Sequence, residues 1–316
     1  MTSQMKRHIV GCCGIILTAF APAESGPAKG PARPPLASVS HLALYANDPA
    51  KSERFYVGDL GAVKLPDLEQ PSGARYYFAP TQFVEVLPLP PGEPSINRLA
   101  HIAFSTPDAE TMRRYLEAQG IKVPRRSIAG ADGSRWFTVT DPEGLIVQFM
   151  QPPANPPAVP VNLLSNHIMH VGFIVHNRPN EDRFYKEVLG LRPYWEGGMR
   201  DDHPTWISLQ LPDGRDWIEY MVVGTPDSKG IPTDMSAANL GVLNHFALGV
   251  ADVRTAYTLL WNGNRLQGQE QTPKIGRDAK WQLNLLDPDG TRAEVMELHA
   301  IGKPCCSPFR APDPER

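Results

Sequence analysis

The sequence predicts an α+β protein built from four copies of one βαβββ module, arranged as two tandem domains. Three observations predict this fold class. Four segments alternate apolar and polar residues with the period of a half-buried strand, and each carries a histidine. A helix follows each segment, and further strands joined by tight turns complete each copy. The four histidine-bearing strands are marked by His41, His101, His170 and His245.

The helices of the first and third modules share one spacing. Phe55 lies 14 residues after His41, and Phe184 lies 14 residues after His170. In both modules the helix ends at a Leu-Gly turn, and the glycine comes six residues after the phenylalanine. This double coincidence indicates that the two modules are copies of one unit.

The last strand of each module carries one polar acceptor near its middle. In the second and fourth modules it comes four positions after the glycine of an Asp-Pro-x-Gly sequence, which is typical of a tight turn between strands. The four residues are Glu85, Gln148, Glu219 and Glu294. A single module would expose a sheet face and a strand edge, so we expect the first to pair with the second and the third with the fourth.

The third and fourth modules together predict a metal site. Alternation places His170 on the same strand face as Gly172, and His245 on the same face as Ala247, so that small neighbours leave room beside each imidazole. Pairing would bring two histidines and two carboxylates to one cavity, which suits one divalent ion of zinc, nickel, manganese, cobalt or ferrous iron. The predicted ligands are His170, Glu219, His245 and Glu294.

The first and second modules predict a weaker site of the same kind. A lone histidine on a strand is usually structural, but here the histidine and the acceptor recur together at matching repeat positions. The matched residues are His41, Glu85, His101 and Gln148. Because Gln148 is neutral, this set offers one carboxylate where the other offers two, and we expect it to bind a cation less tightly.

Paired βαβββ modules with a first-strand histidine and a last-strand glutamate resemble the vicinal oxygen chelate superfamily. Its members include glyoxalase I, methylmalonyl-CoA epimerase, extradiol ring-cleaving dioxygenases and bleomycin-resistance proteins. The resemblance covers about residues 37–300. It implies a metal with exchangeable positions that bind substrate oxygens, and a ligand glutamate, Glu294 or Glu219, that acts as the catalytic base.

This resemblance leaves three functions open. We expect a divalent-metal-dependent, glyoxalase-like lyase or isomerase that transfers a proton on a small oxygenated substrate. An extradiol-type dioxygenase would instead use His170, His245 and Glu294, and a fourth ligand at Glu219 argues against it. The third alternative is a non-enzymatic protein that binds a small ligand, like the bleomycin-resistance proteins.

The amino terminus has the pattern of a secretory signal peptide. Lys6 and Arg7 precede an apolar run over residues 9–20, and small residues follow at 21–23. The pattern predicts a secreted or periplasmic protein. We expect a signal peptide at 1–23, a flexible leader at 24–36, the first domain at 37–152, a Pro-rich linker at 153–165, the second domain with the main metal site at 166–300, and a tail at 301–316.

Charge and cysteine content suggest little about partners. The formal net charge is −3 without a block of like charges, so we expect a small-molecule substrate, no nucleic acid and, after processing, no membrane. The sequence leaves open whether the protein forms a homodimer. Cys12 and Cys13 lie in the signal segment, and Cys305 and Cys306 are adjacent. No pair has zinc-site spacing, so we expect all four to be incidental, although an exported protein could form a vicinal or intermolecular bond at 305–306.

Overall fold

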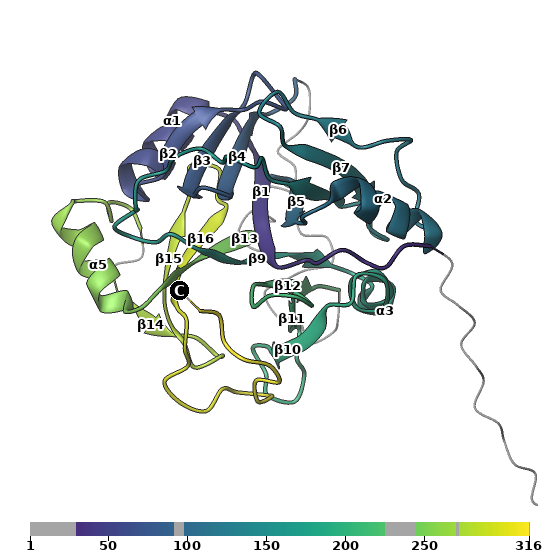
Figure 1. Ribbon diagram of the computed structural model, residues 1–316. Coiled ribbons are helices and arrows are strands. Elements are labelled where there is room, and N and C mark those ends of the chain that lie inside the picture. Colours follow the sequence, from purple (N-terminus) through teal and green to yellow (C-terminus); the bar gives the residue numbers. More distant parts are fainter. Residues whose placement is uncertain (1–29, 92–97, 225–243, 270–271, 316) are drawn as a thin grey trace, which may run out of the picture.

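Two curled sheets of eight strands form the protein, one for each domain (Figure 1). The structure is a computed structural model that describes residues 30–91, 98–224, 244–269 and 272–315. The strand orders are β2-β3-β4-β1-β5-β8-β7-β6 and β10-β11-β12-β9-β13-β16-β15-β14. The two orders match strand for strand, which confirms the prediction of four modules in two pairs.

The first sheet combines the first two modules. The first module contributes β1 (Ser38–Ala46), β2 (Val63–Pro66), β3 (Ala74–Ala79) and β4 (Gln82–Pro88). The second contributes β5 (Leu99–Ser105), β6 (Ile128–Ala129), β7 (Arg135–Thr140) and β8 (Ile146–Gln151). β1 pairs antiparallel with β5 at the centre, and each of these strands pairs in parallel with the last strand of its own module.

The second sheet repeats this plan. The third module contributes β9 (Ile168–Val175), β10 (Arg192–Gly197), β11 (Trp206–Gln210) and β12 (Trp217–Val222). The fourth contributes β13 (His245–Val250), β14 (Lys274–Ile275), β15 (Trp281–Leu286) and β16 (Arg292–Glu297). The antiparallel β9–β13 pair again joins the two modules at the centre of the sheet.

One helix follows the first strand of each module, and each has a polar N-cap. The helices are α1 (Pro49–Glu53), which continues as the π-helical turn η1 (Arg54–Asp59), α2 (Ala109–Ala118), α3 (Arg178–Asp182), which continues as η2 (Arg183–Val188), and α5 (Val253–Asn262). Asp48, Asp108, Asn177 and Asp252 accept backbone N–H groups of the first turn, which would otherwise lack partners.

The two domains share one core and meet along β1 and β9. A continuous cluster of buried apolar side chains extends through both domains, from Leu42 and Phe104 to Phe173 and Phe246. At the centre of the contact the Gln82 amide nitrogen donates to the carbonyl oxygens of Val39 and Ile168, at 2.9 Å each. The domains therefore form one packed body.

The chain outside the modules also contacts the second domain. Arg33, in the segment expected as a leader, forms an ion pair with Asp213 at 2.7 Å, and Leu36 is fully buried. Cys305 and Cys306, which we expected to be incidental, form a disulfide, so that expectation was wrong and the vicinal bond that we left open is present. The expected signal peptide at 1–23 lies outside the described residues.

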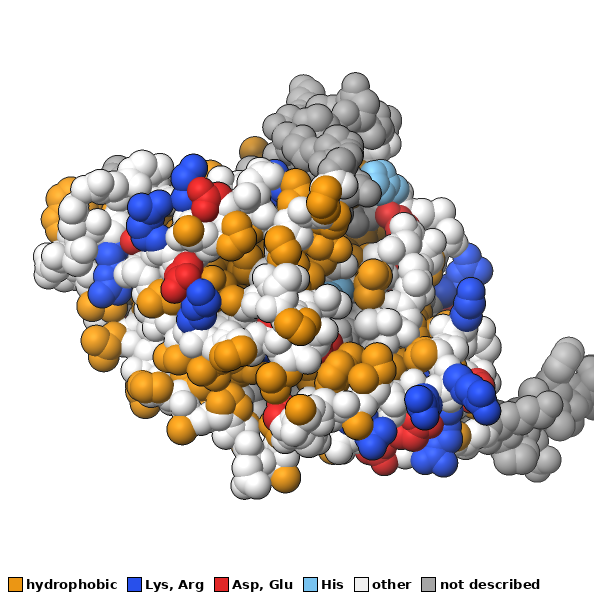
Figure 2. Space-filling model, turned by 90° about the horizontal axis from the view of Figure 1, so that it is seen from above, with side chains coloured by type: hydrophobic (Ala, Val, Ile, Leu, Met, Phe, Trp, Pro, Cys, Tyr) orange, Lys and Arg blue, Asp and Glu red, His pale blue; other side chains and the backbone are white. Residues whose placement is uncertain are grey.

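Charges of both signs lie on the face of the molecule that Figure 2 shows. On the face that Figure 2 shows, Lys and Arg side chains are interspersed with Asp and Glu, and apolar side chains lie between them. Among the described residues, the structure has no helix with the length and apolar character needed to cross a bilayer.

Candidate metal centre

Strand register brings the predicted ligands of the second domain together. In the β9–β13 pair, His170 lies opposite Ala247 and His245 lies opposite Gly172. The outer neighbours continue these two rows: β12 places Glu219 beside Gly172, and β16 places Glu294 beside Ala247. Each row thus has a histidine and a glutamate on either side of a small residue.

Three of the four predicted ligands converge closely. One ligand atom from each of His170, His245 and Glu294 lies within 4.8 Å of the other two. His170 Nε2 is 3.5 Å from Glu294 Oε2, and the two imidazole rings meet edge to face with their centroids 5.1 Å apart. Glu219 lies beside this set, with Oε2 3.2 Å from His245 Nε2 and Oε1 3.3 Å from the Ser208 hydroxyl.

Gly172 makes room for His245. A Cβ atom added at Gly172 would overlap the imidazole ring of His245 at three ring atoms. The contact is with the ring of His245, which is fully buried. The backbone conformation of Gly172 is one that other residues also adopt. The reason for a glycine here is therefore the space that the His245 ring occupies.

The donor set fits a divalent metal ion. Burial, followed by the neighbouring His245, Arg292 and Lys280, lowers the pKa of His170 well below its usual value, so the imidazole is neutral and able to bind a cation. Within the described part of the chain, neither nitrogen of this buried ring has a hydrogen-bond partner. Two histidines and one carboxylate form the ligand set that non-haem ferrous enzymes use, with open positions for substrate.

Two further charged residues, Arg292 and Glu219, lie beside the three converging ligands. Arg292 Nη1 is 3.2 Å from Glu294 Oε1, which leaves Oε2 directed to the histidines. Burial raises the pKa of Glu219, although Arg292 and the Ser208 hydroxyl act in the opposite direction. Glu219 is thereby suited to take up and release a proton nearer to neutral pH than an exposed glutamate.

A small pocket opens over these residues. It has a volume of about 80 Å³, and Glu219 and Glu294 lie in its wall. The rest of the wall comes from Trp195, Trp206, Met221, Arg277, Asp278, Gln282, Arg292 and Met296. Burial raises the pKa of Asp278 to about 7. Sequence reasoning identified the glutamates but missed Trp195, Arg277 and Asp278, because they come from other strands and loops and have no repeat signal.

In the corresponding site of the first domain, a buried guanidinium pairs with the candidate ligand Glu85. His41, Glu85 and His101 do converge within 4.8 Å. However, the Arg75 guanidinium lies 3.4 Å from Glu85 Oε1 and 3.2 Å from Asp67 Oδ1, and it also pairs with Glu69. This buried arginine supplies positive charge where the second domain has none on that strand.

The predicted fourth ligand of the first site is held elsewhere. The Gln148 amide nitrogen donates to both carboxylate oxygens of Glu69, at 3.0 and 3.1 Å. His41 Nε2 and His101 Nε2 are hydrogen-bonded to each other at 3.0 Å, and the Ser40 hydroxyl meets His41 Nδ1 at 3.0 Å. Unlike His170, His41 therefore has partners at both ring nitrogens.

One register position contributes to the difference between the domains, in addition to Arg292, which pairs with Glu294 in the second site. Arg75 lies opposite Glu85 in the β3–β4 pair, and Ser208 lies opposite Glu219 in the β11–β12 pair. The two residues thus occupy the same place in their modules. Ser208 places no charge beside Glu219, whereas Arg75 places a positive charge beside Glu85.

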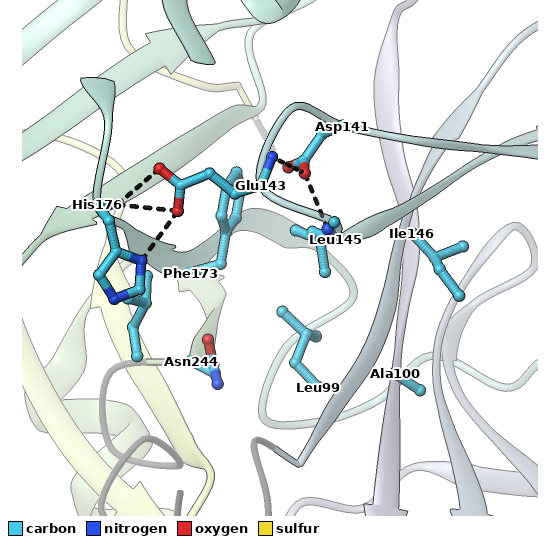
Figure 3. Close-up of a pocket in the computed structure, with 11 residues that line it drawn as sticks. Leu99, Ala100, Asp141, Glu143, Leu145, Ile146, Phe173, His176 and Asn244 are labelled. Atoms are coloured by element: carbon cyan, nitrogen blue, oxygen red, sulfur yellow. Dashed lines mark hydrogen bonds and ion pairs between the residues drawn. The ribbon is translucent and has the colours of Figure 1, made fainter. Parts of the chain in front are cut away.

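Another pocket, of about 280 Å³, lies where the two domains meet (Figure 3). His176 and Glu143 contact each other across it, with His176 Nδ1 3.0 Å from Glu143 Oε2. The Asp141 carboxylate turns back on its own loop and accepts the Leu145 N–H at 2.8 Å. None of the predicted metal ligands lines this pocket, and its His176–Glu143 contact joins the two domains.

Solved structures share this two-domain fold. A variant of homoprotocatechuate 2,3-dioxygenase from B. fuscum matches with 17% identity and a TM-score of 0.61, over 85% of this chain and 74% of that chain. The 2,3-dioxygenase LapB from Pseudomonas sp. KL28 matches with 13% identity and a TM-score of 0.60, over 84% and 93%. A catechol 2,3-dioxygenase matches with 14% identity and a TM-score of 0.59, over 89% and 92%. At these identities the likeness shows the fold alone.

Comparison of sequences identifies the family. No curated protein matches the chain. The Glyoxalase/Bleomycin resistance protein/Dioxygenase superfamily matches it twice, over residues 38–149 and 156–295. The resemblance to the vicinal oxygen chelate fold is thereby confirmed, and the chain belongs to this superfamily.

Proposed function

We propose that the protein is a ring-cleaving dioxygenase of the extradiol type, with ferrous iron held by His170, His245 and Glu294. The observation that carries the proposal is the convergence of these three residues within 4.8 Å, with Glu219 beside the set. Our sequence-based objection to a dioxygenase was that Glu219 would be a fourth ligand. The geometry weakens that objection, because three ligands leave open positions at a ferrous ion.

The architecture supports the same proposal. The dioxygenases named above match this chain along both domains, and LapB and catechol 2,3-dioxygenase are themselves covered over 93% and 92% of their length. The residues that line the pocket also support the proposal. Trp195 and Trp206 offer flat apolar surfaces for an aromatic ring, and Glu219 and Glu294 line the same pocket.

Each side chain would have one task. A bound ferrous ion would supply open coordination positions for the two neighbouring oxygens of an aromatic diol and for dioxygen. Glu219 would accept a proton from a substrate hydroxyl, since its pKa is raised and it lies beside the ligand set. Arg292 would hold Glu294 in its ligating orientation, and the two tryptophans would position the ring.

Oxygen uptake with catechol-class substrates tests this proposal. Protein loaded with ferrous iron should consume oxygen and form a ring-opened product. Glu294→Gln should lose iron, whereas Glu219→Gln should keep iron and lose turnover by about 10²-fold or more, the scale of general-base catalysis. Glu85→Gln is the matched control in the first domain and should leave activity unchanged. An iron-loaded protein that never consumes oxygen with any such diol would refute the proposal.

A second candidate is the glyoxalase-like proton transfer that we expected from the sequence. The observation that favours it is the raised pKa of Glu219, which suits a base that removes a proton next to a carbonyl. The test is deuterium exchange from solvent into hydroxy-carbonyl compounds without oxygen. Exchange that Glu219→Gln abolishes would support this function in place of the dioxygenase, and exchange that survives both glutamate substitutions would exclude it.

We also propose that the protein is exported. The signal-like pattern at 1–23 supports this, as does the disulfide between Cys305 and Cys306, since such bonds persist mainly in oxidising compartments. Mass spectrometry of protein from its native host should find an amino terminus near residue 24. A chain that retains Met1 in the cytoplasm would contradict it.

A further inference from the structure

The chain that follows the last strand covers one wall of the second domain. Residues 299–315, the tail segment, belong to no module and run along β10 (yellow in Figure 1). The Arg310 N–H donates to the Tyr194 carbonyl at 2.8 Å, and the Glu196 N–H donates to the Ser307 hydroxyl at 2.9 Å. The tail segment therefore satisfies backbone and side-chain groups at this sheet edge.

A buried lysine anchors the far end of the tail segment. Lys280 is fully buried, and its Nζ donates to Asp313 Oδ1 at 2.9 Å and to the Leu298 carbonyl at 2.6 Å. The same ammonium group lies over the rings of Trp217 and Phe309, at 5.4 and 5.1 Å. A buried charge with these partners is costly to expose, so this end is firmly held.

The disulfide lies earlier in the tail segment, against two residues of the wall of the metal pocket. Trp195 Nε1 donates to the Cys305 carbonyl at 3.2 Å, and the Cys305 N–H donates to the Arg277 carbonyl at 2.9 Å. The Arg277 guanidinium also approaches Cys306 Sγ at 3.9 Å. Trp195 and Arg277 both line the pocket. The disulfide thus contacts two residues of the pocket wall directly.

The disulfide also holds an unfavourable backbone. Cys306 has a φ of 69°, in the left-handed region that residues other than glycine seldom adopt. The bond to the adjacent Cys305 closes a small ring that restrains this conformation. Cys306 is exposed, so a dissolved thiol can reach its sulfur. Once the bond is broken, the residue is free to leave the left-handed region, and its neighbours lose their fixed partner.

We infer that Cys305–Cys306 is a thiol–disulfide exchange site that releases the part of the tail segment around the disulfide and widens the metal pocket. A dithiol supplies two electrons and two protons. Its thiolate attacks one cysteine sulfur, the S–S bond breaks, the dithiol closes to a cyclic disulfide, and both cysteines become thiols. The inference rests on the pocket wall and not on the reaction catalysed there, so it stands or falls separately from the proposed dioxygenase.

Hydrogen–deuterium exchange on the full-length protein, without added metal, tests the inference. Dithiothreitol should reduce the pair, as intact mass shows. Exchange in peptides covering 299–312 should then accelerate by roughly tenfold, the size expected when one left-handed residue is released. Peptides covering Trp195 and Arg277 should also exchange faster, while β16 should not change. A pair that resists the dithiol, or equal exchange rates in the oxidised and reduced proteins, would overturn the inference.

A variant separates this disulfide from other effects of the reductant. Cys305→Ser with Cys306→Ser should exchange at the rate of the reduced wild type, and dithiothreitol should not change it further. The comparison matters because Cys12 and Cys13 are also present in the full chain. A double variant that exchanges as slowly as the oxidised wild type would show that the bond does not hold the tail segment.

Discussion

Tyr56 of the first module donates a hydrogen bond of 2.9 Å to Asp287 Oδ2 in the turn of the fourth module. The third and second modules repeat this contact, because Tyr185 donates to Asp141 Oδ2 at 3.1 Å. Each tyrosine directly follows the phenylalanine of its helix, and each aspartate begins an Asp-Pro-x-Gly turn. The two domains are therefore joined twice by one and the same interaction.

Tyr56→Phe should destabilise the protein by about 1–3 kcal/mol, because it leaves the buried Asp287 acceptor without this donor. Urea denaturation measures the loss. Tyr185→Phe is the matched variant on the other side and should lose a similar amount. A large effect of one substitution and none of the other would contradict the equivalence of the two contacts.

Glu181 should make stability depend on pH. It occupies the position that Ser52 has in the first module, and burial together with the nearby Asp141 and Glu143 raises its pKa. The unfolded carboxyl ionises at about pH 4.3, while the folded carboxyl keeps its proton to higher pH. The folded state then binds more protons, so this contribution to stability is complete below the unfolded pKa and is lost as pH rises through the folded pKa.

Glu181→Gln should remove this dependence. The free energy of unfolding of the variant relative to wild type should rise between about pH 5 and about pH 8, measured by urea denaturation at each pH. Glu53→Gln, on the exposed side of α1, serves as the control and should leave the slope unchanged. A wild-type advantage that grows with pH would have the wrong sign for a neutral Glu181.

Gly172→Ala should disrupt the metal site, since the added methyl group would overlap the His245 ring. We expect metal affinity to fall at least 10-fold, roughly the effect of misplacing one ligand. Titration of the metal-free protein measures it. Gly249→Ala is the matched control on the neighbouring strand, because the atoms nearest to its added Cβ belong to the side chains of Leu298, Met169 and His167 and not to a predicted ligand. Equal affinities of the two variants would argue against His245 as a ligand.

Arg75 and Ser208 should determine which domain binds metal. Wild-type protein should bind one equivalent, in the second domain. Ser208→Arg would place a guanidinium opposite Glu219 and should abolish that binding, because a fixed positive charge competes with the cation. Arg75→Ser should create a second, weaker equivalent at His41, Glu85 and His101. Two equivalents bound by the wild type would contradict this assignment, and isothermal titration with metal analysis distinguishes the outcomes.

Periodicity within single strands was enough to predict which side chains share a face of a strand. Alternation was enough to place Glu219 and Glu294 on the faces that carry His170 and His245, because one residue of shift would turn every side chain over. It could not anticipate Arg75, whose effect depends on the register between β3 and β4. Nor could it anticipate that Tyr56 would meet Asp287, since the contact joins modules that are far apart in sequence.

The double contact between domains has a consequence for connectivity. Sheets join the first module to the second and the third to the fourth, while the two Tyr–Asp contacts join the second to the third and the fourth to the first. The four modules thus form a closed ring of neighbours, and the proline-rich linker spans only one of its four joints. A chain cut within residues 153–161 would keep all four contacts between neighbouring modules. The linker therefore keeps the two domains in the same molecule, and the contacts between modules specify how the domains assemble.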